Sequence, residues 1–353
     1  MALLELTRQP GRIAVRLGPT SAVIRPRMLA VCLGLAVASA LAFAVELSFG
    51  DYPIPLLDVV RALFGVGDRA TLFVIEELRL PRALVGLLVG CAFGVSGALF
   101  QTLTRNPLAS PDMIGLSSGS ATAVVAAMVL GFGAGLGTQA LGLFGGIATA
   151  VLIYGLAWKG GTTGYRIVLV GIGISWMCTS LTSYLLVKAD MWEAQQVLRW
   201  IIGSLNGADW VHVTPLAWAV LVLGIAVLLL SRWLRLLQLG TDVATALGVP
   251  VRFAQPALIV TAAALVSFAT AATGPIVFVA LTAPQIAQRL TGCAWPPLVA
   301  SGLTGSFLVL GSDLIAQRVI PGTLLPIGVV TGAFGGLFLL WLLTRANRVG
   351  SGG

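Results

Sequence analysis

Residues 113–158 read MIGLSSGSATAVVAAMVLGFGAGLGTQALGLFGGIATAVLIYGLAW, which is 46 residues without one charged side chain. Residues 253–288, FAQPALIVTAAALVSFATAATGPIVFVALTAPQIAQ, add another 36 uncharged residues. A helix needs about 20 mostly apolar residues to cross a bilayer. No soluble fold of this size buries so much uninterrupted apolar sequence. The two stretches therefore predict an all-α, polytopic membrane protein.

The composition of the whole chain agrees with this prediction. Hydrophobic residues make up 58% and charged residues 10%, against roughly 25% charged residues in a soluble domain. The 43 glycines suit helices that pack closely in lipid. The cysteines all lie in apolar stretches without a C-x-x-C pair, so we read them as small core residues and infer neither a disulfide nor a metal site. They are Cys32, Cys91, Cys178 and Cys293.

Apolar periods predict ten transmembrane helices in one domain, residues 28–345. The run 113–158 must turn near residues 133–135. The run 253–288 breaks at Gly274 and Pro275, because proline removes a backbone donor and stops a helix. The expected spans are 28–48, 83–103, 115–133, 137–158, 166–187, 213–231, 253–273, 275–290, 298–317 and 326–343. The eighth span is short, and we expect a partial helix that its neighbours shield from lipid.

Basic residues set the orientation of these spans. With both termini in the cytoplasm, 14 of the 21 basic residues and three of the 13 acidic residues lie inside. This distribution satisfies the positive-inside rule, and the opposite orientation violates it. Residues 1–27 are then expected to form a flexible, basic cytoplasmic tail next to anionic lipid. They lack the cleavage site of a signal peptide. Residues 346–353 form a C-terminal tail whose Gly-Ser-Gly-Gly end resembles an artificial linker.

Three connections between the spans are long enough to hold short helices. An amphipathic stretch at residues 56–63 and a second at 191–200 (MWEAQQVLRW) fall on the outer side. The third connection is cytoplasmic, and its residues 239–250 (LGTDVATALGVP) combine a polar cap, a helical turn or two and a Gly-Val-Pro stop. A short helix in this position is well placed to receive force from a soluble partner.

The sequence lacks the patterns of an enzyme. It has no H-E-x-x-H, no G-x-S-x-G and no phosphate-binding G-x-x-x-x-G-K-[ST] loop, so we predict no catalytic residue, no metal and no cofactor in this chain. His212, the single histidine, reads as an interfacial residue. Secondary transporters usually keep ionisable groups near the bilayer midplane. Here only Asp313 comes near a span, close to its outer end, so a transporter of this kind needs energy from another subunit.

Five motifs, in this order and spacing, resemble the permeases of type II ABC importers for iron-siderophores, haem and cobalamin. They are residues 79–82 (RLPR), 96–101 (SGALFQ), 105–115 (RNPLASPDMIG), 274–281 (GPIVFVAL) and 325–331 (LPIGVVT). The resemblance covers about residues 28–345 and is strongest to permeases of the ferric-enterobactin type. Where the family commonly has Pro-His in the eighth span, this chain has Pro284-Gln285, which we interpret as a structural position.

The resemblance implies a permease subunit that translocates a ferric siderophore delivered by an extracytoplasmic binding protein. It further implies a second permease, here expected to be a similar but different chain, and two ABC ATPase subunits that hold ATP and Mg. The expected location is the bacterial inner membrane. The nearest alternative is an importer of the same type that carries haem or cobalamin. An ion-coupled secondary transporter is an alternative of another class.

The resemblance also assigns Arg79 and Arg82 to docking of acidic residues on the binding protein. Anchoring of the helix end, with local pairing to Glu76 or Glu77, is the alternative. A third docking arginine of the family falls at Gln317, with Arg318 next to it. Because one residue along a helix turns the side chain by about 100°, Arg318 is the less certain member of the docking set.

Two cytoplasmic assignments follow from the same resemblance. The ATPase-coupling loop, about residues 238–252, contains Gly240, Asp242, Ala244, Leu247 and Gly248. A plain cytoplasmic turn is the alternative there, and residues 106–115 are expected to lie beside it or only to shape a tight re-entry. The cytoplasmic gate is expected at Thr162, Thr163, Gly164 and Tyr165.

The translocation path is expected along the fifth span, where hydroxyl side chains recur every four residues on one helix face. Interhelical packing of small hydroxyl residues is the equally weighted alternative. The outer helix would supply the entrance. The residues expected to line the path are Ser175, Trp176, Thr179, Ser180, Ser183, Gln196, Arg199 and Trp200.

Overall fold

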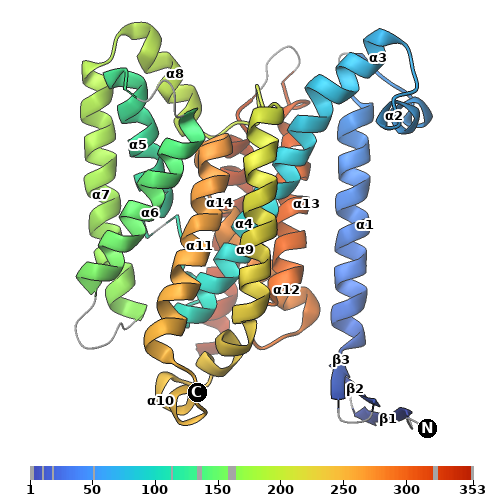
Figure 1. The fold of residues 1–353 in the computed structure, drawn as a ribbon, viewed down its shortest axis with the longest axis vertical. Coiled ribbons are helices and arrows are strands. Elements are labelled where there is room, and N and C mark those ends of the chain that lie inside the picture. Colours follow the sequence, from blue (N-terminus) through green and yellow to red (C-terminus); the bar gives the residue numbers. More distant parts are fainter. Residues whose placement is uncertain are drawn as a thin grey trace.

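Ten helices occupy the ten expected spans in the computed structural model, which describes residues 4–9, 12–17, 20–50, 52–112, 114–132, 137–157, 164–320 and 325–350. They run side by side along one direction (Figure 1). They are α1 (Pro26–Ser48), α4 (Leu80–Thr104), α5 (Leu116–Leu130), α6 (Gly137–Ala157), α7 (Gly164–Lys188), α9 (Trp210–Leu237), α11 (Val251–Thr273), α12 (Val279–Thr291), α13 (Leu298–Ala316) and α14 (Ile327–Gly350). The all-α prediction is confirmed for the membrane-spanning part of the described chain.

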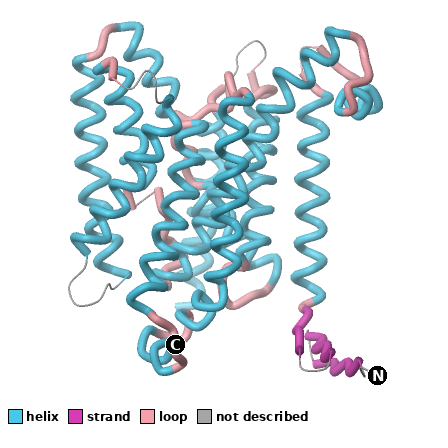
Figure 2. Tube along the Cα trace, in the orientation of Figure 1, coloured by secondary structure: helices cyan, strands magenta, loops and turns pink. Residues whose placement is uncertain are grey.

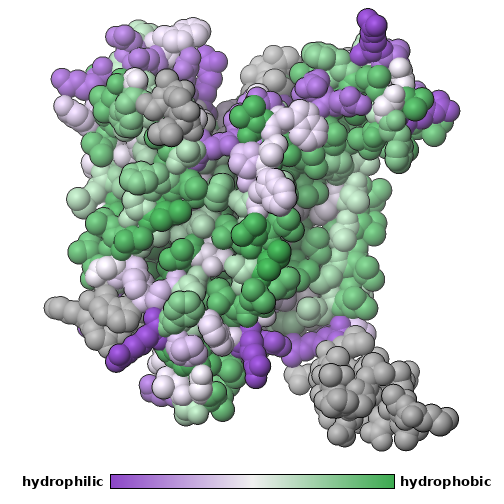
Figure 3. All heavy atoms as spheres, viewed as in Figure 1, coloured by the Kyte–Doolittle hydropathy of each residue, from purple (hydrophilic) through white to green (hydrophobic). Residues whose placement is uncertain are grey.

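The helices differ in their ability to cross a membrane. Among the described residues, seven helices are long and apolar enough to do so. Helix α5 and the apolar part of α14 are shorter, and α12, the expected eighth span, has 13 residues. Figure 3 shows a broad apolar band around the middle of the visible face, with hydrophilic side chains toward both ends. This distribution is that of a multi-pass membrane protein.

Short helices cover the two ends of the bundle. Helices α2 (Leu56–Leu63), α3 (Arg69–Phe73) and α8 (Met191–Ile201) lie at one end. Helix α10 (Thr241–Ala246) lies at the other end, where α1 begins and α14 ends (Figures 1 and 2). Helices α2, α8 and α10 fall in the segments that the sequence predicts, with α10 on the side of the two termini.

The RLPR motif departs from the expected position before the second span. A π-helix, η1 (Val74–Arg79), joins α3 to α4, so Arg79 and Arg82 lie inside one continuous helical segment. The Leu80 N–H bonds to the Ile75 carbonyl five residues earlier, and Pro81 follows. Because Pro81 has no N–H and its ring crowds the preceding turn, the wider π turn lets the helix continue through it.

The N-terminal segment also differs from the flexible tail that we expected. Strands β1 (Leu4–Gln9), β2 (Arg12–Leu17) and β3 (Thr20–Ile24) form an antiparallel sheet in the order β1-β2-β3. The reason is visible in β2, where Ile13, Val15 and Leu17 alternate with other residues at the two-residue period of a strand.

Glycines on α4 explain why this helix lies at the centre of the bundle. A Cβ atom on Gly90 would overlap the Gly305 carbonyl of α13, and one on Gly97 would overlap the Ala280 carbonyl of α12. Side-chain-free positions therefore let α4 approach both helices at backbone distance, which is how membrane helices gain packing contacts. Helices α4 and α11 are the most buried spans, whereas α1 and α7 are the least buried.

Candidate functional site

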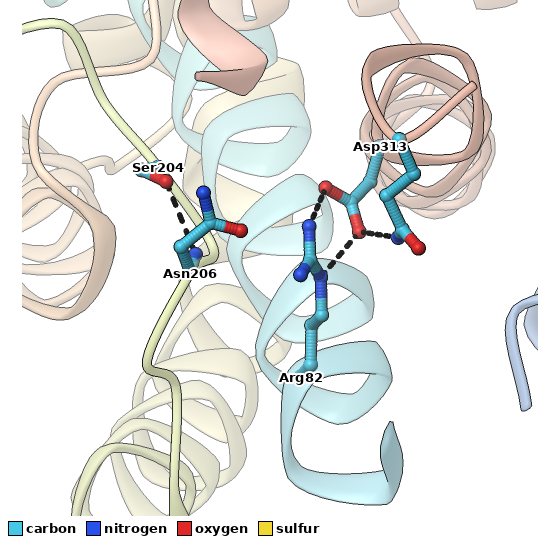
Figure 4. A network of polar contacts seen from close by, with 5 residues as sticks. Arg82, Ser204, Asn206 and Asp313 are labelled. Atoms are coloured by element: carbon cyan, nitrogen blue, oxygen red, sulfur yellow. Dashed lines mark hydrogen bonds and ion pairs between the residues drawn. The ribbon is translucent and has the colours of Figure 1, made fainter. Parts of the chain in front are cut away.

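A buried ion pair lies near the end of the bundle that carries α2 and α8 (Figure 4). Arg82, in the first turn of α4, donates through Nε to Asp313 Oδ2 and through Nη2 to Asp313 Oδ1, both at 2.8 Å. The Asp313 side chain is 1% exposed and that of Arg82 is 17% exposed. Two parallel bonds of this kind orient both groups and tie α4 to α13.

Gln317 completes the surroundings of Asp313. It lies one helical turn after Asp313, and its Nε2 donates to Asp313 Oδ2 at 2.8 Å. Gln317 is the position that corresponds to a third docking arginine in the resembling family. In this chain its side chain therefore serves the Arg82–Asp313 pair.

The other two arginines of the expected docking set lie around the end of α1. Arg79 donates through Nη1 to the Leu47 carbonyl at 2.8 Å and through Nη2 to the Tyr52 carbonyl. Arg318 is exposed, with Cζ 5.6 Å from the centre of the Phe49 ring. Arg79, Arg82 and Arg318 thus share one end of the molecule, and the two bonds of Arg79 to backbone carbonyls fit the helix-anchoring alternative. Docking itself stays a prediction.

Sequence reasoning did not predict that Arg82, Asp313 and Glu46 lie in one cluster. It placed Asp313 near the outer end of a span but named no partner for it, because Arg82 lies 231 residues earlier in the chain. It did not single out Glu46, which the structure places inside α1 with 3% exposure. A signal was present for Gln317, since it is four residues after Asp313 on one helix face.

Helix α10 forms the expected compact unit at the opposite end. It begins after Gly240 at φ 118° and is followed by Gly248 at φ 82°, backbone values that side-chain-bearing residues rarely adopt. Ala244 is fully buried and holds the helix to the body of the protein, while Asp242 and Leu247 are exposed. Of the five residues expected to couple to an ATPase, Ala244 thus faces inward.

The loop after α4 reaches both α10 and the interior. Arg105 donates through Nη2 to the Leu237 carbonyl at the end of α9, just before α10. Farther along the loop, the half-buried Asp112 accepts a hydrogen bond from Ser117 Oγ. Burial raises the pKa of Asp112 to about 6, although the bond from Ser117 opposes the shift.

The expected path residues lie along one side of the molecule, on α7 and α8. Thr179 Oγ1 donates to the Ser175 carbonyl and Ser183 Oγ to the Thr179 carbonyl, so their donors are satisfied within the helix. Trp176, Thr179, Ser180 and Ser183 are exposed, and Ser175 Oγ lies 3.1 Å from Ser118 Oγ of α5. Ser175 therefore packs between helices, while the other four are available to a path or a partner.

Helix α8 exposes polar side chains at the end of the bundle opposite α10. Its capping box joins Asp190 to Glu193, and Val197 is fully buried. Gln196 and Arg199 are exposed, and Trp200 is half-buried. Of the expected gate, Thr162 and Thr163 lie outside the described residues, and Gly164 and Tyr165 form the first turn of α7.

A buried amide pair joins α4 to α12 where the resembling family commonly has histidine. Gln285 Nε2 donates to Gln101 Oε1 at 2.7 Å, and Gln101 Nε2 donates to the Leu281 carbonyl at 3.0 Å. Both side chains are buried. These contacts agree with the structural reading of Gln285.

The apolar helix bundle with its polar ends defines a class of protein. A bundle of apolar helices has polar elements at its two ends, and the described residues contain no group of three or more metal-ligating side chains. Such a molecule is a polytopic membrane protein. The FecCD transport family matches residues 35–345, and the chain belongs to this family.

Individual relatives agree with this assignment. The chain is 42% identical to the ferric enterobactin transport system permease protein FepG of Escherichia coli K12, over 91% of this chain and 98% of FepG. It is 34% identical to FepD of the same organism, over 90% of this chain and 96% of FepD. A solved structure described as a metal-chelate type ABC transporter, in an inward-facing conformation, matches with a TM-score of 0.80 and 26% identity, covering 90% of this chain and 99% of that one.

Proposed function

We propose that this chain is a permease subunit of an ATP-driven importer that carries a ferric siderophore into the cell. The observation that carries the proposal is the similarity to FepG along almost the whole of both chains. The separate polar ends of the bundle fit the proposal, because a subunit without its own ATPase needs one end for cargo delivery and another for an energy-supplying partner.

A binding protein would deliver cargo at the end that carries Arg79, Arg82 and Arg318. Arg318 is exposed there and can meet an acidic side chain directly. Arg82 keeps a partly exposed edge, while Asp313 occupies its Nε and Nη2 donors. Docking through Arg82 would thus add contacts to a guanidinium that the protein already holds in place.

ATP and Mg would be bound by two partner ATPase subunits at the end that carries α10. The exposed apolar side chains of Leu239, Val243 and Leu247 on and beside this short helix suit a cleft in a soluble partner. Because Ala244 fixes the helix to the core, a movement of α10 would be passed on to α9 and α11 rather than absorbed locally. The expected outcome is alternate opening of an outer and an inner gate.

A second permease would complete the path. FepG and FepD are both permease proteins of a ferric enterobactin transport system, and this chain is similar to both. The similarity supports a heterodimer of related chains. Helix α7 is among the least buried spans and exposes Trp176, Thr179 and Ser183, so its face can contribute to a path between two such chains.

The test is reconstitution of the chain in vesicles, with and without the second permease, the ATPase and the binding protein. We expect accumulation of a ferric siderophore only with all partners and ATP. Uptake of haem or cobalamin in preference to a ferric siderophore would change the proposed cargo but leave the proposed ATP-driven import mechanism unchanged. Accumulation by vesicles that hold this chain alone, driven by a proton or sodium gradient, would overturn the proposal.

A further inference from the structure

Glu46 is a buried carboxyl group whose position the proposed function does not use. It lies in the last turn of α1, a helix that is otherwise the least buried span. Glu46 is nevertheless 3% exposed, because the end of α1 packs on α4 and α13 and on an apolar cluster that includes Leu47, Ile75 and Ala83. Within the described part of the chain, neither carboxyl oxygen of Glu46 has a hydrogen-bond partner.

The charged groups that face Glu46 do not balance it. On α13 the carboxylate of Asp313 lies close enough to interact with the Glu46 carboxyl, and on α4 so does Arg82. Arg82 already donates through Nε and Nη2 to Asp313. Two carboxyl groups thus share one guanidinium in a site with little access to water.

The described charged side chains on the other elements that pack on α1 have contacts of their own. Arg79 of η1 directs its guanidinium to the carbonyls of Leu47 and Tyr52. On α2, Arg61 and Asp58 pair with each other at 3.2 Å on the surface. Helix α12 meets α1 at the opposite end, where Arg27 donates to the carbonyl of Leu290.

We propose that Glu46 holds a proton at the junction of α1, α4 and α13, with Asp313 as the acceptor of its hydrogen bond. Glu46 carries the proton as a carboxylic acid and donates its O–H to a carboxylate oxygen of Asp313, which keeps its two bonds to Arg82. The proton comes from the aqueous phase at this end of the protein, and binding changes the net charge of the three groups from −1 to zero. An ionised Glu46 would instead be a buried charge without a partner, which is strongly unfavourable.

The bound proton joins α1 to the rest of the bundle. With the proton present, the hydrogen bond between Glu46 and Asp313 adds a polar link to the apolar contacts of α1. Without it, two carboxylates face each other across the same contact and repel. The outer end of α1, around which Arg79 and Arg318 lie, therefore becomes less firmly attached as the pH rises.

Infrared spectroscopy of the purified full chain tests the proposal directly, because a protonated carboxyl group absorbs in a region separate from carboxylates and amides. The measurement uses a pH of about 7.5 and the Asp112→Asn background, which removes a further acid whose pKa is raised, to about 6. We expect one carboxylic acid band that disappears in Glu46→Gln. The matched control is Glu77→Gln, an exposed acid at the same end, which should leave the band unchanged.

Two outcomes would overturn the proposal. The first is absence of the band at this pH, which would mean that Glu46 is ionised and paired with Arg82 or with water. The second is a band that persists in Glu46→Gln. Asp313→Asn supplies an independent variant in case Glu46→Gln does not fold. It should remove the band, because Arg82 then lacks its carboxylate and pairs with an ionised Glu46, and an unchanged band would exclude Asp313 as the group that keeps Glu46 protonated.

Discussion

Among single residues, the pair formed by Arg82 and Asp313 gives the sharpest prediction. Removing one partner leaves the other as a buried, unpaired charge, so Asp313→Ala should lower the free energy of unfolding by roughly 3–5 kcal/mol. The matched control is Asp58→Ala, which breaks the exposed pair with Arg61 and should cost about 1 kcal/mol or less. Denaturant unfolding of the purified chain in detergent measures both values.

A double variant separates the pair from other effects of the substitutions. If Arg82 and Asp313 act mainly on each other, Arg82→Met with Asp313→Leu should recover much of the stability that either single variant loses, because no buried charge remains. Losses that simply add would show that the two side chains act through different partners.

Asp112 should make the stability of the protein depend on pH. Its pKa is raised to about 6 by burial, so the folded protein binds its proton more tightly than the unfolded chain. The stabilising contribution is fully present below about pH 4 and is lost as the pH rises through about 6. A shift of about two pKa units corresponds to about 3 kcal/mol. Asp112→Asn should therefore remove a pH-dependent change of this size from the free energy of unfolding.

Thermal unfolding between about pH 4 and 7, compared for the wild type and Asp112→Asn, measures this difference. Asparagine keeps an oxygen that can accept the bond from Ser117 but has no proton to lose. Asp242→Asn, an exposed acid in α10, is the control and should leave the pH profile as it is. Equal pH profiles for all three proteins would contradict the account of Asp112.

Single residues also mark the limit of prediction from sequence. The positions of Arg79 and Arg82 near one end of a helix followed from the order of the chain. Their partners did not, because hydrogen bonds to Asp313 and to the Leu47 carbonyl depend on how distant helices pack. Burial of Glu46 escaped notice for the same reason, since a glutamate near the end of a span is usually solvated.

At the scale of helices, close packing between α4 and α13 should tolerate no side chain at Gly90. A Cβ atom there would overlap the Gly305 carbonyl, so Gly90→Ala forces the two backbones apart and should cost roughly 1–3 kcal/mol. Gly34→Ala in α1 has open space around its Cβ and is the control. Equal unfolding free energies for the two variants would mean that the helices can separate without loss.

Helix α10 permits a similar comparison for function. Gly248, at φ 82°, ends this helix with open space around it, so Gly248→Val acts through backbone strain alone. We expect ATP hydrolysis in the reconstituted complex to continue while transport falls several-fold. Gly65→Val, at φ 75° and likewise in open space next to α2, imposes the same strain at the other end and should leave transport unchanged.

The helices were largely predictable because the apolar or amphipathic character of each stretch is a local property of the sequence. Ten apolar stretches gave ten helices, and the polar or amphipathic stretches gave α2, α8 and α10. The π-helix η1 was missed, because Pro81 reads as a helix start unless a wider turn precedes it. The N-terminal strands were missed because five arginines in the first 27 residues outweighed the two-residue alternation of β2 in our reading.

For the whole molecule, the two ends have different compositions and should therefore face different compartments. The end with α10 also receives the start of α1 and the end of α14. Among the described basic residues, Arg105, Arg235 and Arg252 lie at helix ends on this side. The positive-inside rule then assigns this end to the cytoplasm and the end with α8 to the outside. The coupling and docking assignments both depend on that orientation.

Labelling of single cysteines with a membrane-impermeant maleimide tests the orientation, in a chain whose Cys32, Cys91, Cys178 and Cys293 are replaced by alanine. Gln196→Cys in α8 should react from outside intact cells, and Asp242→Cys in α10 should react only in inside-out vesicles, because both positions are exposed to water at opposite ends. Leu33→Cys, on the exposed apolar face of α1, should react in neither preparation, since maleimide needs a thiolate and lipid disfavours the charged form. Labelling of Asp242→Cys from outside intact cells would place α10 away from any cytoplasmic ATPase, and the proposed coupling could not operate.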